Sequence, residues 1–312
     1  MKLERLVIAF VLLSLMACSP PAEEMVSFPI EVTDQQGKTI KLEKIPERII
    51  SLVPSNTEIL FALGLEDKVI GVTEYCNYPP EALDKEKIGG FSTPDMEEII
   101  ALQPDLILAG SIHEKEIIPS LEGRGLTVFA LAPKNLNGIL EDIKIVGKIT
   151  GREEEAFEVV AQMKNRIEAV TDKIRKLQAR PRVFYITWHD PLWSIGSGTI
   201  IQELVEEAGG VNIFRSTITG HKAVNLEPVI ACNPQVIIAC TGHGEAKGLP
   251  FEWAKSEPRL RVTEACQNNR VYQIDADLVS RTGPRIVDAL EWFAYFIHPE
   301  IFSKPTEGKG GK

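Results

Sequence analysis

The 312-residue sequence lacks the features that define several large classes of protein. It contains no run of 18 or more apolar residues, which excludes a helix that spans a membrane. Acidic residues number 44 against 34 basic ones, and this net charge of −10 without a compensating basic patch argues against nucleic-acid binding. Five cysteines are too few for a disulfide scaffold. With 44% hydrophobic residues, the sequence is that of an acidic globular protein, long enough to form two lobes.

The motifs of the common enzyme classes are missing as well. No Gly-x-Gly-x-x-Gly follows a strand, and neither a phosphate-loop lysine motif nor His-Glu-x-x-His occurs. The five histidines lack the compact spacing of metal ligands. Residues 90–94, Gly-Phe-Ser-Thr-Pro, lack the final glycine of a nucleophile elbow. We therefore expect no enzyme, no protein-held metal and no intrinsic cofactor.

The first 17 residues have the pattern of an export signal. Lys2 and Arg5 precede the apolar run Leu6–Leu13, and small residues follow before Cys18. A cysteine at this point looks like a bacterial lipobox, in which lipid is attached to Cys18 after residues 1–17 are removed. Acyl chains anchor firmly because each buried methylene contributes about 0.8 kcal/mol. The alternative is an ordinary secretory signal with an incidental cysteine. Either places the protein outside the cytoplasm, and lipidation predicts anchoring to the extracytoplasmic face of a membrane, inner or outer.

The other four cysteines leave two possibilities open. In an exported protein Cys76, Cys232, Cys240 and Cys266 could pair, with three possible complete connectivities. They could equally be buried free thiols that behave as small hydrophobic side chains.

Short apolar runs alternate with helical patterns along the rest of the chain, which predicts an α/β fold with parallel sheets flanked by helices. We expect a tether and hairpin over 18–45, an N-terminal lobe over 46–151, a C-terminal lobe over 181–302 and a disordered tail over 303–312. Strands are expected at 49–53, 69–72, 106–109, 127–131, 183–187, 236–240 and 271–274. A capping box from Ser55 to Glu58 is expected to open a helix that ends at Gly64.

A single long helix is predicted between the lobes, over residues 152–180. Apolar residues recur there at three-to-four spacing, from Val160 to Leu177, and neither Pro nor Gly interrupts them before Pro181. A continuous helix resists bending, so we expect little hinge motion between the two similar lobes.

An internal repeat supports two related lobes. Residues 96–109 align without gaps on 226–239, with identity at six of 14 positions. The repeat makes Glu97 and Glu227 equivalent, close to the start of matching helices. Two related carboxylates on two related lobes suggest docking to a two-fold symmetric partner. Alternatively, each carboxylate simply stabilises its helix N-terminus.

Together these features resemble the class III periplasmic binding proteins, the helical-backbone substrate-binding proteins of ABC importers in the iron-siderophore and cobalamin class. Within that class the likeness is greatest to cobalamin (vitamin B12)-binding lipoproteins, and it covers about residues 48–297. The stretches that carry it are 48–58, 75–82, both repeat units, 209–214 and 280–285.

The resemblance implies roles for individual residues. It places Tyr75 and Phe91 on the ligand-facing wall of the N-terminal lobe, although Phe91 could instead plug the core. On the C-terminal lobe it places Trp193 at an aromatic position and Asp277 and Arg281 at polar positions. A corrinoid has apolar faces and a rim of amides, which suits aromatic face contacts and a few polar groups.

The resemblance also gives Glu97 and Glu227 a partner, because the family uses these glutamates to meet arginines of a permease dimer. One position departs from the family. His221, six residues before Glu227, stands where the family has a pocket tryptophan. His221 or His189 is therefore a candidate axial ligand to the metal of a bound cofactor.

The sequence thus predicts an extracytoplasmic receptor that captures cobalamin or a related corrinoid and delivers it to an ABC importer. A ferric siderophore or haem is the alternative ligand. A membrane-anchored hydrolase is a more remote alternative, for which the sequence supplies no triad.

Overall fold

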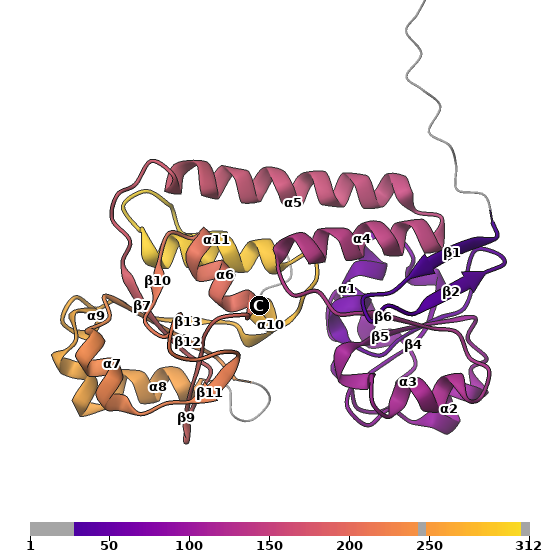
Figure 1. The fold of residues 1–312 in the computed structure, drawn as a ribbon, viewed down its shortest axis with the longest axis horizontal. Coiled ribbons are helices and arrows are strands. Elements are labelled where there is room, and N and C mark those ends of the chain that lie inside the picture. The colour runs from indigo at the N-terminus through magenta and orange to yellow at the C-terminus, as the bar shows by residue number, and fades with distance from the viewer. Residues whose placement is uncertain (1–27, 243–247, 307–312) are drawn as a thin grey trace, which may run out of the picture.

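A computed structural model describes residues 28–242 and 248–306. The predicted signal peptide, Cys18 and the end of the predicted tail lie outside the described residues. The described chain forms two α/β lobes side by side, and a long helix runs along one side of both (Figure 1). The predicted fold class is therefore confirmed. Within these residues no helix is both long and apolar enough to cross a membrane.

The N-terminal lobe has a four-stranded parallel sheet in the order β4-β3-β5-β6. Its central strands are buried on both faces, as expected for a parallel sheet covered by helices. The elements are the hairpin β1 (Ile30–Thr33) and β2 (Thr39–Leu42), then β3 (Ile49–Ser51), α1 (Pro54–Ala62), β4 (Val69–Val72), α2 (Met96–Ala101), β5 (Leu106–Gly110), α3 (Ile117–Glu122), β6 (Val128–Leu131) and α4 (Leu136–Thr150).

The C-terminal lobe repeats this topology with the order β10-β7-β12-β13, all parallel. Its elements are β7 (Arg182–Ile186), α6 (Ile200–Glu207), β10 (Val211–Asn212), α7 (Leu226–Cys232), β12 (Val236–Cys240), α8 (Leu249–Ser256), α9 (Glu264–Gln267), β13 (Val271–Ile274), α10 (Ala276–Ser280) and α11 (Ile286–Ile297).

The sequence repeat is also a structural repeat. Both copies run from a short helix through a left-handed residue into a central strand, with φ of 47° at Gln103 and 44° at Asn233. An arginine at the start of the neighbouring strand, just before β3 or first in β7, secures each turn. Arg48 Nε donates to the Gln103 carbonyl at 3.1 Å, and Arg182 Nε donates to the Asn233 carbonyl at 2.9 Å.

The connecting helix is α5 (Glu153–Ile174), 22 residues or about 33 Å long. It is confirmed but ends before the predicted boundary, because residues 175–176 form a turn after Ile174. It packs closely on α4, where a Cβ at Gly147 would lie 2.5 Å from the Ala156 Cβ. Glycine at this position therefore permits the contact.

The structure corrects the predicted start of α1. The helix begins at Pro54, after Val53, and no side chain caps it. The expected capping box from Ser55 to Glu58 is therefore wrong, because the Glu58 carboxylate binds side chains of the other lobe instead. The four cysteines that the structure describes are free thiols, which settles the alternative left open by the sequence.

A small antiparallel sheet was not predicted. It has the order β11-β9-β8 and consists of β8 (Trp188–His189), β9 (Leu192–Ile195) and β11 (His221–Ala223). Two and three residues are too few to give a period-two pattern, so the sequence carries little signal for it. The sheet carries Trp193 and His221, two of the predicted ligand contacts.

Candidate functional site

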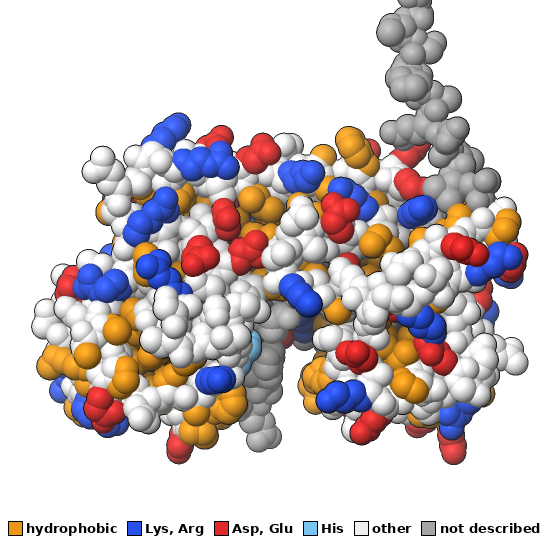
Figure 2. All heavy atoms as spheres, viewed as in Figure 1, with side chains coloured by type: hydrophobic (Ala, Val, Ile, Leu, Met, Phe, Trp, Pro, Cys, Tyr) orange, Lys and Arg blue, Asp and Glu red, His pale blue; other side chains and the backbone are white. Residues whose placement is uncertain are grey.

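The carboxyl ends of strands from the two lobes face each other across the molecule. The Arg281 side chain, which follows β13, donates to the Glu58 side chain after β3 and to the Tyr75 backbone carbonyl after β4. The surface is hollowed between the lobes on the side away from α5 (Figure 2). In α/β proteins, ligands bind outside the carboxyl ends of parallel strands. The candidate site is therefore the cleft between the lobes.

Two aromatic side chains that are predicted to form the N-terminal wall of this cleft lie next to each other. Tyr75 follows β4 and Phe91 lies in the loop before α2. Their rings meet edge to face with centroids 5.8 Å apart, while the residues remain 55% and 36% exposed. The structure thus brings together two predicted ligand contacts that are 16 residues apart in the sequence. Because the Phe91 side chain is partly exposed, its position favours the predicted ligand-facing role over packing in the core.

The unpredicted sheet carries the side chains that are predicted to form the C-terminal wall. Trp193 in β9 is 36% exposed and pairs with Trp188 on one side and Ala223 on the other. His221, in β11, pairs with Ile195 and is exposed. The surrounding protein nevertheless lowers the pKa of His221, because it removes water that would stabilise the imidazolium. His221 is therefore a neutral imidazole near pH 7.

The structure separates His189 from His221. His189 and its cross-strand partner Leu192 line a cavity of about 410 Å³ that also contains Glu227 and Trp253. Trp193, next to Leu192, does not line it, as the alternation of side chains along a strand requires. The Nδ1 atom of His189 is buried without a hydrogen-bond partner.

The two predicted docking glutamates lie in matching places. Glu97 and Glu227 are both exposed, and each is in the first turn of its helix, α2 and α7. The helices belong to different lobes and lie away from α5 (Figure 1). Their surroundings differ, since Glu227 lies in a cavity with Arg259 and raises the pKa of that arginine, although less than Glu257 does.

A buried ion-pair network joins the lobes, and the sequence did not predict it. The Glu58 side chain is 1% exposed and accepts from Arg281 Nη1 at 3.1 Å and from Arg285 Nε and Nη2 at 2.9 and 2.5 Å. The Arg285 guanidinium also lies 3.7 Å from the centre of the Tyr78 ring. We call Glu58, Arg281 and Arg285 the interlobe network.

The network occupies the polar groups predicted to bind ligand. Arg281 is 8% exposed and donates to Glu58, to Asp277 at 2.6 Å and to the Tyr75 carbonyl at 3.3 Å. Asp277 also accepts from Asn77 of the N-terminal lobe at 3.4 Å. Ligand contact by Arg281 and Asp277 stays a prediction, and a ligand that binds either group competes with these partners.

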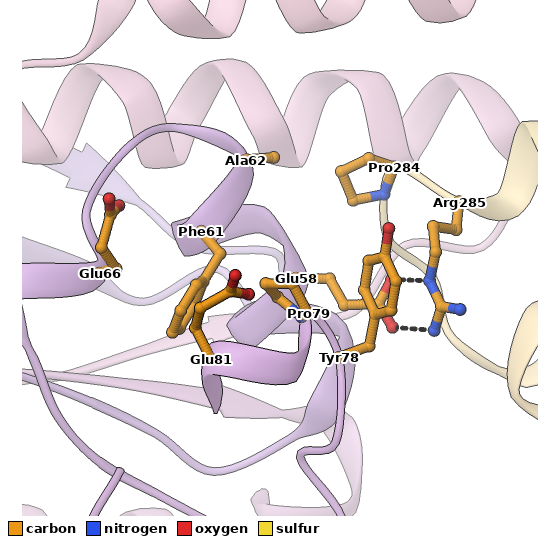
Figure 3. Close-up of a pocket in the computed structure, with 9 residues that line it drawn as sticks. All are labelled: Glu58, Phe61, Ala62, Glu66, Tyr78, Pro79, Glu81, Pro284 and Arg285. Atoms are coloured by element: carbon orange, nitrogen blue, oxygen red, sulfur yellow. Dashed lines mark hydrogen bonds and ion pairs between the residues drawn. The ribbon is translucent and has the colours of Figure 1, made fainter. Parts of the chain in front are cut away.

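A second cavity, of about 430 Å³, adjoins the interlobe network. Glu58, Tyr78 and Arg285 converge on it from both lobes, and Phe61 and Glu81 line the N-terminal side (Figure 3). None of the six predicted ligand-binding residues lines this cavity. It is therefore distinct from the aromatic walls of the cleft.

Comparison with known proteins settles the class. Residues 49–278 match the model of the periplasmic binding protein family. The chain belongs to this family. It is the extracytoplasmic substrate-binding component of an ABC transporter, it is not an enzyme, and its partner is a permease. The predicted class, fold and lack of enzymatic function are thereby confirmed.

Relatives of this binding protein include a lipoprotein without a named ligand and a protein named for vitamin B12. It is 31% identical to the uncharacterized ABC transporter substrate-binding lipoprotein YvrC of Bacillus subtilis, over 96% of this chain and 97% of the relative. It is 32% identical to the vitamin B12-binding protein of Vibrio cholerae, over 78% of this chain and 87% of that one.

Solved structures give the same class, and the two described here are named for different ligands. The vitamin B12-binding protein BtuF of Vibrio cholerae aligns with a TM-score of 0.70 and 30% identity, over 81% of this chain and 97% of that one. The haem-binding protein RhuT of Roseiflexus sp. RS-1 aligns with a TM-score of 0.72 and 26% identity, over 81% and 98%.

Proposed function

We propose that this binding protein captures cobalamin or a related corrinoid between its lobes and delivers it to the permease. The observation that carries the proposal is the pair of exposed aromatic walls, Tyr75 with Phe91 on one lobe and Trp193 on the other. Flat apolar faces are what a large macrocycle offers to aromatic side chains. Similarity to vitamin B12-binding proteins supports the same choice of ligand.

Haem is the second candidate ligand, because the chain is also similar to the haem-binding protein RhuT. His221 is exposed beside Trp193 and its lowered pKa keeps the imidazole neutral, the form that binds a metal. A neutral imidazole suits haem iron as an axial ligand and suits the cobalt of a corrinoid equally. A ferric siderophore has no comparable support among the described residues.

Two further parts of the proposal concern attachment and docking. We propose that Cys18 carries the lipid that holds the protein to the membrane, which agrees with the name lipoprotein given to the Bacillus relative. We also propose that Glu97 and Glu227 meet basic residues of the permease. Their equivalent, exposed positions on two related lobes match a partner with two-fold symmetry.

Calorimetry with the purified mature protein tests the ligand. Cyanocobalamin, haem and a ferric siderophore are titrated in parallel, and we expect binding of cyanocobalamin at micromolar or lower concentration. If haem binds and cyanocobalamin does not, haem is the ligand and the corrinoid proposal is wrong. If none of the three binds, the proposed function is wrong.

The axial-ligand role of His221 has a spectroscopic test. Aquocobalamin or haem is added to the wild type, to His221→Ala and to His189→Ala as the matched control, and the visible spectrum is recorded. A coordinating His221 predicts loss of the spectral shift only in His221→Ala. An unchanged shift in that variant removes the idea.

A further inference from the structure

We propose that His113 is a positioning residue that fixes the Phe91 wall of the ligand cleft. His113 is fully buried in the short 3-10 helix Ser111–His113 after β5, and it was not among the predicted site residues. The inference rests on the proposed function, because it assigns Phe91 to the cleft wall. Its structural part is testable without any ligand.

Two hydrogen bonds fix the orientation of the His113 ring. Nδ1 lies 3.1 Å from the backbone nitrogen of Gly110, which can only donate, so Nδ1 accepts. Nε2 lies 2.5 Å from the Phe91 carbonyl oxygen, which can only accept, so Nε2 carries the proton. The partners therefore select the neutral Nε2–H tautomer. Burial also lowers the pKa of His113, which keeps the ring neutral at physiological pH.

Besides one turn bond within it, from the Thr93 amide to the Gly90 carbonyl at 3.3 Å, the loop that carries Phe91 is held at its base. The Asp95 amide donates to the Ile88 carbonyl at 2.8 Å, and the Glu74 amide donates to the Gly89 carbonyl at 3.0 Å. Both bonds lie at the neck of the loop. The bond from His113 reaches Phe91 itself, so it connects the loop to the end of the central strand β5. The orientation of the Phe91 ring against Tyr75 thus depends on a side chain behind the wall.

The internal repeat shows why this bond matters. Phe91 and His221 are equivalent at the offset of 130 residues, and each precedes a predicted docking glutamate by six residues. In the C-terminal lobe, β11 pairs with β9 through three residues, so the backbone fixes that wall. In the N-terminal lobe the equivalent residue lies in a loop without a strand partner, and a histidine side chain takes the place of the sheet.

Two variants separate the two hydrogen bonds of the ring. In His113→Gln, the amide nitrogen can reach the place of Nε2 and donate to the Phe91 carbonyl. In His113→Asn, the amide oxygen can accept from Gly110, but the side chain is too short to reach Phe91. The variants remove the imidazole equally and differ in the bond that the proposal requires.

The test combines fluorine NMR with ligand titration. The protein is labelled with 4-fluorophenylalanine, and Phe91→Leu identifies the Phe91 resonance. We expect His113→Asn to shift or broaden that resonance and to weaken cyanocobalamin binding about five- to tenfold, the effect of one hydrogen bond. His113→Gln should retain the wild-type resonance and affinity. A wild-type Phe91 resonance in His113→Asn, or equal changes in both variants, overturns the proposal.

Two outcomes are kept distinct. If the wild type fails to bind cyanocobalamin, the corrinoid function is wrong, and the fluorine resonance still decides the role of His113. If neither variant folds, nitrogen-15 NMR of the wild-type imidazole decides it instead. We expect a slowly exchanging Nε2–H and an unprotonated Nδ1, and an Nδ1–H tautomer or a rapidly exchanging proton would overturn the assignment.

Discussion

The two lobes share one topology but hold the side chains that we propose to face the ligand in different ways. The C-terminal wall, with Trp193 and His221, is built on a small antiparallel sheet, so the backbone fixes it. The N-terminal wall, with Tyr75 and Phe91, lies on loops that side chains hold in place. The two copies of the repeat therefore share their sheets and helices but differ in the loops that connect them. The sheets and helices form the packed core, whereas the loops lie on the surface and can vary.

The largest expected effect on stability comes from disrupting the interlobe network, which joins the two lobes. In Glu58→Ala the guanidinium groups of Arg281 and Arg285, 8% and 17% exposed, lose their shared carboxylate. Because an unpaired buried charge is costly, we expect the free energy of unfolding to fall by about 3–5 kcal/mol. Urea unfolding measures it, with the exposed Glu66→Ala as the control. Equal midpoints for the two variants would show that the network contributes nothing.

The aromatic walls allow the lobes to be compared through ligand affinity. We expect Tyr75→Ala and Trp193→Ala each to weaken cyanocobalamin binding about 10- to 100-fold, since buried aromatic anchors carry much of the energy of a binding site. Phe157→Ala, which removes a 71% exposed ring on α5, should leave the affinity unchanged. A loss in only one of the two wall variants would mean that one lobe alone recognises the ligand.

Stability of the N-terminal lobe should depend on pH through Asp142. This residue of α4 is buried, and burial raises its pKa from 3.8 to about 8, although Gln35 donates to the carboxyl. The folded protein therefore retains a proton that the unfolded chain loses near pH 4. The stability from this proton is complete below pH 4 and is lost as pH rises through about 8.

Asp142→Asn should remove that dependence. We expect the variant to be about 1–3 kcal/mol more stable than the wild type above pH 8, with a smaller difference in acid. Thermal unfolding between pH 4 and pH 9 measures it, and Asp190→Asn in the C-terminal lobe is the control. A wild type and an Asp142→Asn variant whose stabilities run parallel over this range would contradict the expectation.

The smallest effects on the isolated protein are expected for Glu97→Gln and Glu227→Gln. Both side chains are exposed, so each change should alter stability by less than about 0.5 kcal/mol and leave ligand affinity intact. Uptake through the cognate permease should fall to a similar extent in both, because the partner is symmetric. Normal uptake in the double variant would remove the docking role.

Much of the fold was predictable because its strands and helices follow from the order of apolar and polar residues within short segments. Strands β4, β12 and β13 begin and end at the predicted residues, since buried parallel strands are short continuous apolar runs. The connecting helix was recognised from its period but not its end, because residues 175–177 carry no helix-stop signal. The β11-β9-β8 sheet was missed because its strands are too short to show a period.

The candidate site was predictable only in part. Resemblance named Tyr75, Phe91 and Trp193 as ligand contacts, and the structure finds all three side chains exposed. The resemblance did not assign a role in the site to Glu58, Arg285 or His113, which are all buried or nearly buried. No sequence pattern marks such residues, because their chemistry comes from a partner on another element.

The sequence by itself determined the α/β alternation, the two related lobes and the long connecting helix, because each depends on residues that are near one another in the chain. Only the tertiary structure decided what particular charged groups do. Glu58 has the spacing of a helix cap, yet it binds an arginine 223 residues away. A buried carboxylate is stabilised by whichever cation the folded lobes bring to it, and that depends on how the lobes meet rather than on local sequence.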